Sequence, residues 1–197
     1  IRSVLKQEFT IDLHINTSSL EKEKVASFLA KNKIERFVLI HPFARKKLRQ
    51  WNLHKYVQLI NYFKKEQQMD TIVVGGIEDE LEIEKLKQLV PFKIYSTVNN
   101  FDLIEFVALI EKAALYVGNE SGPLHMAAVS NIPTIGLFGP GVPKVFYPIG
   151  NNATYIHHVL SCNPCNQINC SRPNNTCMDL IEVSEVTIKA NELLNRK

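Results

Sequence analysis

The feature that most constrains the fold of this chain is a regular alternation between short apolar runs and longer amphipathic segments. The apolar runs, which are rich in β-branched residues, lie at 36–42, 70–76, 92–96, 114–118, 133–139 and 153–158. Segments with helical spacing of apolar residues lie at 53–65, 79–89, 102–113 and 182–194, and a short helix is expected between the fourth and fifth runs. Continuous apolar strands that alternate with helices predict a parallel sheet covered on both faces.

Six such units in series predict an α/β fold, a Rossmann-like doubly wound sheet with strand order 3-2-1-4-5-6. In that order the first strand (37–41) and the fourth (115–118) are neighbours at the switch point, and ligands bind beyond their carboxyl ends. We assign this domain to residues 36–197. Residues 1–35 are expected to form a strand at 10–15, a helix with Ser18 or Ser19 as N-cap, and an interdomain segment.

Composition and charge limit the partners and the compartment that we expect for this chain. The chain has 197 residues, 45% of them hydrophobic, which suits one large domain with a substantial core. Its net charge is only +3, so no nucleic-acid partner is expected. No apolar run reaches the length of a membrane span and no signal-peptide pattern opens the chain, so we expect a cytoplasmic protein with reduced thiols. Because the chain begins at Ile1, we expect an excised domain with a missing N-terminal partner.

The loop after the fourth strand is the first candidate site. Ser121 and Gly122 stand where a helix should begin, and Pro123 suits its first turn. The free amides and the positive dipole end of such a helix attract anions, and glycine lets a bulky anion approach the backbone. A tight turn with a capping serine and no ligand is an equally good interpretation of this loop alone.

The loop after the first strand favours the anion. It carries Arg45, Lys46, Lys47 and Arg49, and one cation aimed at a phosphate on a helix terminus is a common arrangement. Some of these charges are expected to be simply solvated. The sequence contains neither G-x-G-x-x-G after the first strand nor G-x-x-x-x-G-K-[ST], so the ligand is predicted to be a phosphate or diphosphate bound without either motif.

Further candidates flank this site. Glu78 lies beyond the second strand, where a carboxylate can accept hydrogen bonds from ribose hydroxyls. Asp79 and Glu80 are better explained as acidic residues of a first helical turn. His125 lies one turn into the short helix, a position more often used for packing than for catalysis. The glycines of 138–141 should close the crevice.

The stretch "GNESGPLHMAAVSNIPTIGLFGP" resembles the signature of glycosyltransferase family 9, the ADP-heptose:lipopolysaccharide heptosyltransferases. The resemblance covers about residues 36–194 and includes "RQW", "GGIEDE" and a cysteine-rich tail that ends in "CMDLIEVSEV". It implies the C-terminal, donor-binding half of a GT-B architecture and an inverting transfer that needs no metal or other cofactor. The general base is then a carboxylate on an N-terminal domain outside this chain.

The resemblance also implies partners and roles. The donor is a nucleotide-sugar, ADP-heptose in the family, and a lipid A–core type acceptor binds through the missing N-terminal domain, with peripheral contact with the inner face of the cytoplasmic membrane. The implied catalytic residues are Arg49 and Glu120. The implied donor-binding residues are Arg45, Glu78, Ser121, Gly122, Pro123 and His125.

Three departures from the family pattern leave the sugar open. Glu120 replaces an aspartate, Arg49 replaces a lysine, and Asn52 replaces a proline. The first two substitutions support an alternative, a non-catalytic nucleotide-binding or interaction module that retains the fold. An NAD-dependent oxidoreductase is disfavoured because the glycine fingerprint is missing.

The cysteines form a separate group at 162–177, spaced C-x2-C-x4-C-x6-C. Four thiolates could hold zinc, but the second pair lacks the usual metal spacing. We expect instead a structural lid whose thiols lie away from the phosphate site, and no metal.

Overall fold

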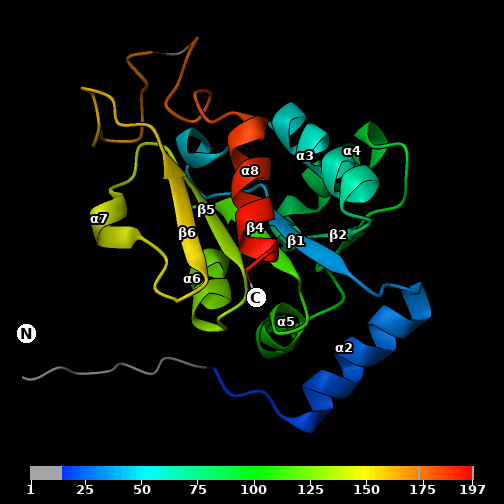
Figure 1. The fold of residues 1–197 in the computed structure, drawn as a ribbon. Helices are drawn as coiled ribbons and strands as arrows, with labels where there is room; N and C mark the ends of the chain where they lie inside the picture. Colours follow the sequence, from blue (N-terminus) through cyan, green and yellow to red (C-terminus); the bar gives the residue numbers. More distant parts are fainter. Residues whose placement is uncertain (1–14, 173, 197) are drawn as a thin grey trace, which may run out of the picture.

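The computed structural model describes residues 15–172 and 174–196, which form a single six-stranded parallel sheet flanked by helices (Figure 1). The strand order is β3-β2-β1-β4-β5-β6, which confirms the doubly wound topology. The strands are β1 (Phe37–His41), β2 (Asp70–Val73), β3 (Tyr95–Ser96), β4 (Leu115–Asn119), β5 (Thr134–Phe138) and β6 (Ala153–His157). The α-helices are α2 (Ser19–Asn32), α3 (Leu53–Glu66), α4 (Glu80–Leu89), α5 (Leu103–Ile110), α6 (Gly122–Val129), α7 (Pro143–Phe146) and α8 (Val183–Leu194), and two 3₁₀ turns are η1 (Lys47–Arg49) and η2 (Ile77–Asp79).

The sheet is buried on both faces, as its continuous apolar strands predict. Val38 and Ile40 of β1 pack in one cluster with side chains of α3, α4 and α8. Phe37 and Leu39 point to the other face and pack with side chains of α2, α5 and α6. Figure 1 shows these two groups of helices on opposite sides of the sheet. Alternate residues of one strand therefore supply both cores.

The N-terminal helix α2 begins at a capping box. Ser18 Oγ accepts a hydrogen bond from Leu20 N at 3.2 Å, and Glu21 Oε2 accepts one from Ser18 N at 2.7 Å. Val25 is fully buried in the cluster shared with α5, and Lys24 pairs with Glu105 at 2.6 Å. Most of the strand expected at 10–15 lies outside the described residues. The division between 1–35 and 36–197 stays a prediction.

The edges of several elements differ from the predicted ones. Strand β2 ends at Val73 rather than at residue 76, because the amide of Gly75 bonds to Thr97 Oγ1 instead of joining the ladder. Strand β3 keeps only two residues, and the short helix α7 was not predicted. None of the helices in the described part of the chain is long and apolar enough to cross a membrane.

The register of β1 against β4 positions the site. Ile40 pairs with Val117 and His41 with Gly118, so the two strands end within one residue of each other, with β4 extending to Asn119. The loops that follow them therefore meet at the carboxyl edge of the sheet, as the switch-point argument requires.

Candidate functional site

Two adjoining cavities occupy the carboxyl edge of the sheet. The first, here called the charged cavity, has a volume of about 730 Å³ and is lined by Arg45, Lys46, Arg49, Glu120 and Ser121, among others. The second, here called the apolar cavity, has a volume of about 440 Å³ and is lined mainly by Val74, Phe101, Leu103, Phe106 and Met126. Both are bordered by His41, Glu78, Asp79, Gly122 and Pro123. The two cavities thus lie side by side and differ in the chemistry of their linings.

The wall that the cavities share is the N-terminus of α6. The helix begins at Gly122, and Pro123 follows in its first turn, as predicted. Ser121 makes no capping hydrogen bond with its side chain; its Oγ donates to the carbonyl of Asn119 at 3.0 Å instead. The alternative interpretation, in which this loop is a turn closed by a capping serine, is therefore not supported. The helix terminus is left as an uncapped, positively polarised wall of the charged cavity.

Arg49 and Glu120 form an ion pair within the charged cavity. Nη1 of Arg49 lies 3.1 Å from Oε1 of Glu120, with the two side chains 26% and 4% exposed. The other carboxylate oxygen, Oε2, is buried and has no hydrogen-bond partner within the described residues. It lies against the backbone of Gly141, where any added Cβ would overlap it. Burial raises the pKa of Glu120, and the Arg49 guanidinium opposes that rise.

Asn119 holds the Arg49 loop against the sheet. Its fully buried amide donates to the carbonyl of Pro42 at 2.8 Å and accepts from Trp51 N at 3.2 Å and from Tyr56 Oη at 3.0 Å. Trp51 is further fixed by its indole N–H, which donates to the carbonyl of Ile181 at 2.9 Å. Sequence reasoning missed Asn119, although a lone amide at the end of an apolar strand is a usable signal.

His41 is a second residue that the sequence analysis did not select. It ends β1, is 7% exposed and borders both cavities. Its Nδ1 lies 2.9 Å from Ser121 Oγ. Burial lowers the pKa of His41 to about 4, so the ring is neutral near pH 7. A neutral ring with one nitrogen bonded to Ser121 helps to fix the loop at the start of α6.

Some of the other predicted residues line the cavities and some do not. Arg45 and Lys46 are exposed and line the charged cavity together with Arg49, whereas the exposed Lys47 does not line it. His125 is half-buried, its pKa is lowered by burial, and it lines neither cavity. The assignment of His125 to the donor site has no geometric support and stays a prediction.

Glu78 lies on the 3₁₀ turn η2, where the cavities meet. Its carboxylate folds over Gly76, and a side chain at that glycine would overlap it. Asp79 accepts a hydrogen bond from Gly76 N at 3.0 Å, and Glu80 is the first residue of α4. Asp79 and Glu80 therefore serve the helix start, as predicted, and Glu78 is the carboxylate of this run that remains available at the cavities.

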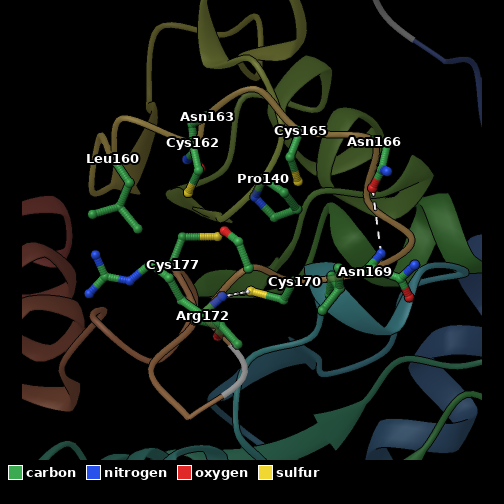
Figure 2. Close-up of a pocket in the computed structure, with 13 residues that line it drawn as sticks. Pro140, Leu160, Cys162, Asn163, Cys165, Asn166, Asn169, Cys170, Arg172 and Cys177 are labelled. Atoms are coloured by element: carbon green, nitrogen blue, oxygen red, sulfur yellow. Dashed lines mark hydrogen bonds between the residues drawn. The ribbon is translucent and has the colours of Figure 1, made fainter.

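The cysteine-rich segment encloses a third, smaller cavity of about 170 Å³ (Figure 2). All four cysteines are free thiols, with Cys177 the buried one. Within 15–172 and 174–196, no group of three or more His, Cys, Asp or Glu side chains is placed to hold a metal ion. The segment also contacts a residue of the charged cavity, since Arg49 Nε donates to Gln167 Oε1 at 2.6 Å. That contact was not anticipated from the sequence.

The fold and this edge site define the class of the protein. It is a Rossmann-like α/β protein with an uncapped helix N-terminus and a cation facing each other at the switch point. A comparison with protein families then identifies the particular family. The model of glycosyltransferase family 9 (heptosyltransferase) matches residues 2–175, so the chain belongs to that family.

Individual relatives agree with this assignment. The chain is 27% identical over 149 residues to lipooligosaccharide heptosyltransferase 2 of Campylobacter jejuni, covering 74% of this chain and 47% of that protein. Its fold is similar to Escherichia coli ADP-heptose lps heptosyltransferase II (TM-score 0.76, 19% identity, 92% of this chain and 53% of that one). It is also similar to E. coli heptosyltransferase WaaC with ADP (TM-score 0.64, 16% identity, 86% and 48%). The chain spans about half the length of the curated relatives it matches.

Proposed function

We propose that this chain is the donor-binding half of an inverting glycosyltransferase of lipopolysaccharide core biosynthesis, with ADP-heptose as the donor. The observation that carries the proposal is the joining of a cationic cavity at a helix N-terminus to an apolar cavity, with Glu78 at the junction. The parts of a nucleoside diphosphate follow the same order: charged phosphates, a ribose with hydroxyls, and an apolar base.

In this proposal each part of the donor has its own residues. The diphosphate lies in the charged cavity against the amides of Ser121 and Gly122, with Arg49 and Arg45 as cations. The ribose hydroxyls donate to the carboxylate of Glu78. The base enters the apolar cavity, where Phe101 and Met126 offer apolar contact surface.

The chemistry follows from the leaving group. An acceptor hydroxyl attacks the anomeric carbon, the new C–O bond forms as the bond to the diphosphate oxygen breaks, and the hydroxyl proton passes to a carboxylate outside this chain. The departing diphosphate gains negative charge. The α6 amides and Arg49 are already in place and stabilise that charge without reorganising. Glu120 holds the Arg49 guanidinium at the cavity wall.

The relatives support the finer parts of the proposal. E. coli ADP-heptose lps heptosyltransferase II and E. coli heptosyltransferase WaaC with ADP both have folds like this chain. Because the chain spans about half of its relatives, we propose that the lipid A–core type acceptor and the general base belong to the other half of the enzyme. An enzyme that acts on a lipid-linked acceptor would lie in the cytoplasm, in peripheral contact with the inner membrane.

A non-catalytic nucleotide-binding module is the second candidate. The Arg49–Glu120 pair favours it, because a buried carboxylate neutralises part of the charge that Arg49 offers to a diphosphate. Both candidates bind a nucleoside diphosphate, and only the first transfers sugar.

Calorimetric titration of residues 1–197 with ADP, UDP, GDP and ADP-heptose tests the binding step. We expect ADP and ADP-heptose to bind, and no sugar transfer by this chain alone. Turnover of ADP-heptose by the chain joined to its acceptor-binding half would then separate the transferase from the module. Binding of none of the four ligands would refute both candidates.

A further inference from the structure

One side chain of the cysteine-rich segment contacts Arg49, a residue that lines the charged cavity. Gln167 lies between Cys165 and Cys170, and its Oε1 accepts a hydrogen bond of 2.6 Å from Nε of Arg49. Arg49 lies on η1, 118 residues earlier in the chain. The contact therefore joins two loops that the fold brings together only at the carboxyl edge of the sheet.

The guanidinium of Arg49 is held at two points. Gln167 binds its Nε–H, and Glu120 pairs with Nη1 at 3.1 Å. A guanidinium is planar and presents five N–H groups in a fixed fork, so two fixed nitrogens set the direction of the rest. Arg49 lines the charged cavity, and its remaining N–H groups are thereby directed rather than free to rotate.

The loop around Gln167 is built to present this side chain. Gln167 has a φ of 61°, in the left-handed region that favours glycine and asparagine. Oδ1 of Asn166 accepts hydrogen bonds from the amide of Ile168 at 3.0 Å and from that of Asn169 at 3.5 Å, and the two bonds close a turn around residue 167. Figure 2 shows the bond to Asn169. Gln167 is half-buried, whereas Ile168 beside it is 74% exposed.

The chemistry of glutamine suits this position. Its amide oxygen accepts from Arg49 without adding charge, whereas a carboxylate there would neutralise Arg49 further beside Glu120 and repel an anionic ligand. Building on the proposed function, we infer that Gln167 is a positioning residue: it orients Arg49 toward the diphosphate and makes the cysteine-rich segment part of the donor site.

The experiment measures the affinity of the chain for ADP and for inorganic pyrophosphate. Gln167→Ala should weaken both by about threefold to tenfold, the loss expected when one hydrogen bond no longer orients the cation. Gln167→Glu should weaken both further, most strongly at low salt. Gln167→Asn keeps the amide and the left-handed preference but shortens the side chain, so it should resemble Gln167→Ala. Ile168→Ala, on the same loop, is the matched control and should bind like wild type.

A purely structural role would give a different pattern. In an Arg49→Ala background Gln167→Ala should change neither affinity, because its effect passes through Arg49. An undiminished effect in that background, or equal affinities for Gln167→Ala and Ile168→Ala, would overturn the inference.

A second measurement does not depend on the proposed function. Arginine-directed labelling with phenylglyoxal, followed at Arg49 by mass spectrometry, should be severalfold faster in Gln167→Ala than in Ile168→Ala. If wild type binds neither ADP nor pyrophosphate, the proposed function fails, and the labelling rates alone decide whether Gln167 restrains Arg49. Equal labelling rates would overturn that restraint.

Discussion

The charged cavity and the apolar cavity share a wall but are built in different ways. In the charged cavity, side-chain hydrogen bonds from distant segments fix the cation. Asn119 holds the loop that carries Arg49, and Gln167 holds the Arg49 side chain. The apolar cavity is an extension of the core: Val74 and Phe106 belong to the buried cluster under it, while Leu103 at its rim is 65% exposed. A surface that stabilises a charged group needs hydrogen-bond donors with fixed directions, whereas a surface that covers an apolar group needs only a complementary shape.

The comparison predicts that the two cavities can be separated with two ligands. Pyrophosphate should engage only the charged cavity, and ADP should engage both. Variants of the charged cavity should therefore weaken both ligands, and variants that act on the ribose or base should weaken ADP alone.

The largest effect is expected for Arg49→Ala. In the proposed mechanism Arg49 interacts more strongly with the leaving diphosphate than with the bound donor, so turnover should fall more than donor affinity. Loss of one charge-assisted hydrogen bond is worth about 1.5–3 kcal/mol, about tenfold to a hundredfold in kcat. The measurement is kcat and KM in the transferase that contains this chain. Lys47→Ala is the control, since Lys47 carries the same kind of charge on the same loop but does not line the cavity. Wild-type kcat in Arg49→Ala would leave the residue without a role in transfer.

A slightly smaller effect is expected for Gly122→Val. Apart from the adjoining residues and the backbone of α6, no atom in the described part of the chain lies within 4 Å of the position that a Cβ would take at Gly122, so the fold can accept the side chain. The same side chain would stand where phosphate must approach the helix terminus, and both ADP and pyrophosphate should bind about tenfold or more weakly, a cost of about 1.4 kcal/mol. The melting temperature should change little. Gly141→Ala is the contrasting variant, because its Cβ would overlap Glu120 and should lower stability. Unchanged pyrophosphate affinity in Gly122→Val would contradict the placement.

Glu78→Gln should have a moderate effect that distinguishes the ligands. If Glu78 accepts from the ribose, its loss should weaken ADP by about 0.5–1.5 kcal/mol, roughly twofold to tenfold, and leave pyrophosphate unchanged. The matched control is Glu80→Gln, which alters the carboxylate that accepts from Asn99 Nδ2 at 3.1 Å. Equal losses for both ligands would contradict a role at the ribose, and a gain for pyrophosphate would show that Glu78 acts by repelling the phosphates.

The smallest effect concerns the pH dependence of stability at Glu120. Burial raises its pKa above the ordinary value of 4.5, so the native chain holds that proton more tightly than the unfolded chain does. Stability from this group must therefore fall as pH rises from the ordinary carboxyl pKa through the raised one, and then level off. Glu120→Gln should remove that decline from the thermal unfolding curves. Glu23→Gln, at an exposed position of α2, should leave it in place. An unaltered pH profile in Glu120→Gln would mean that Arg49 fully offsets the burial.

The sequence predicted the strands because their signal is local and repeated, and their order followed from the usual topology of a doubly wound fold. All five residues of β1 are buried, and the same continuous apolar pattern recurs in β4 and β5. Once the order was known, the switch point and its two loops followed. The end of β2 was harder to predict, because the amide of Gly75 bonds to the side chain of Thr97, 22 residues away.

Only those parts of the site that depend on local backbone structure and strand order could be predicted from the sequence. The start of α6 follows from Gly122 and Pro123, and the cations of the facing loop follow from their place after β1. The contacts of Asn119, His41 and Gln167 depend on partners 63–118 residues away, which no local pattern specifies. Glu120 was assigned by resemblance, and its pairing with Arg49 became visible only in three dimensions.

The hydrogen bonds of Asn119 have a consequence for how the chain folds. They span 63, 68 and 77 residues, and they are made only when β4 docks beside β1. Strands β1 to β3 and their helices can pair earlier, because their contacts are closer in sequence. The loop after β1 should stay mobile in that intermediate stage and become ordered late. During synthesis, the charged cavity would therefore not form until residue 119 had emerged, and the hydrogen bond to Arg49 would wait for Gln167.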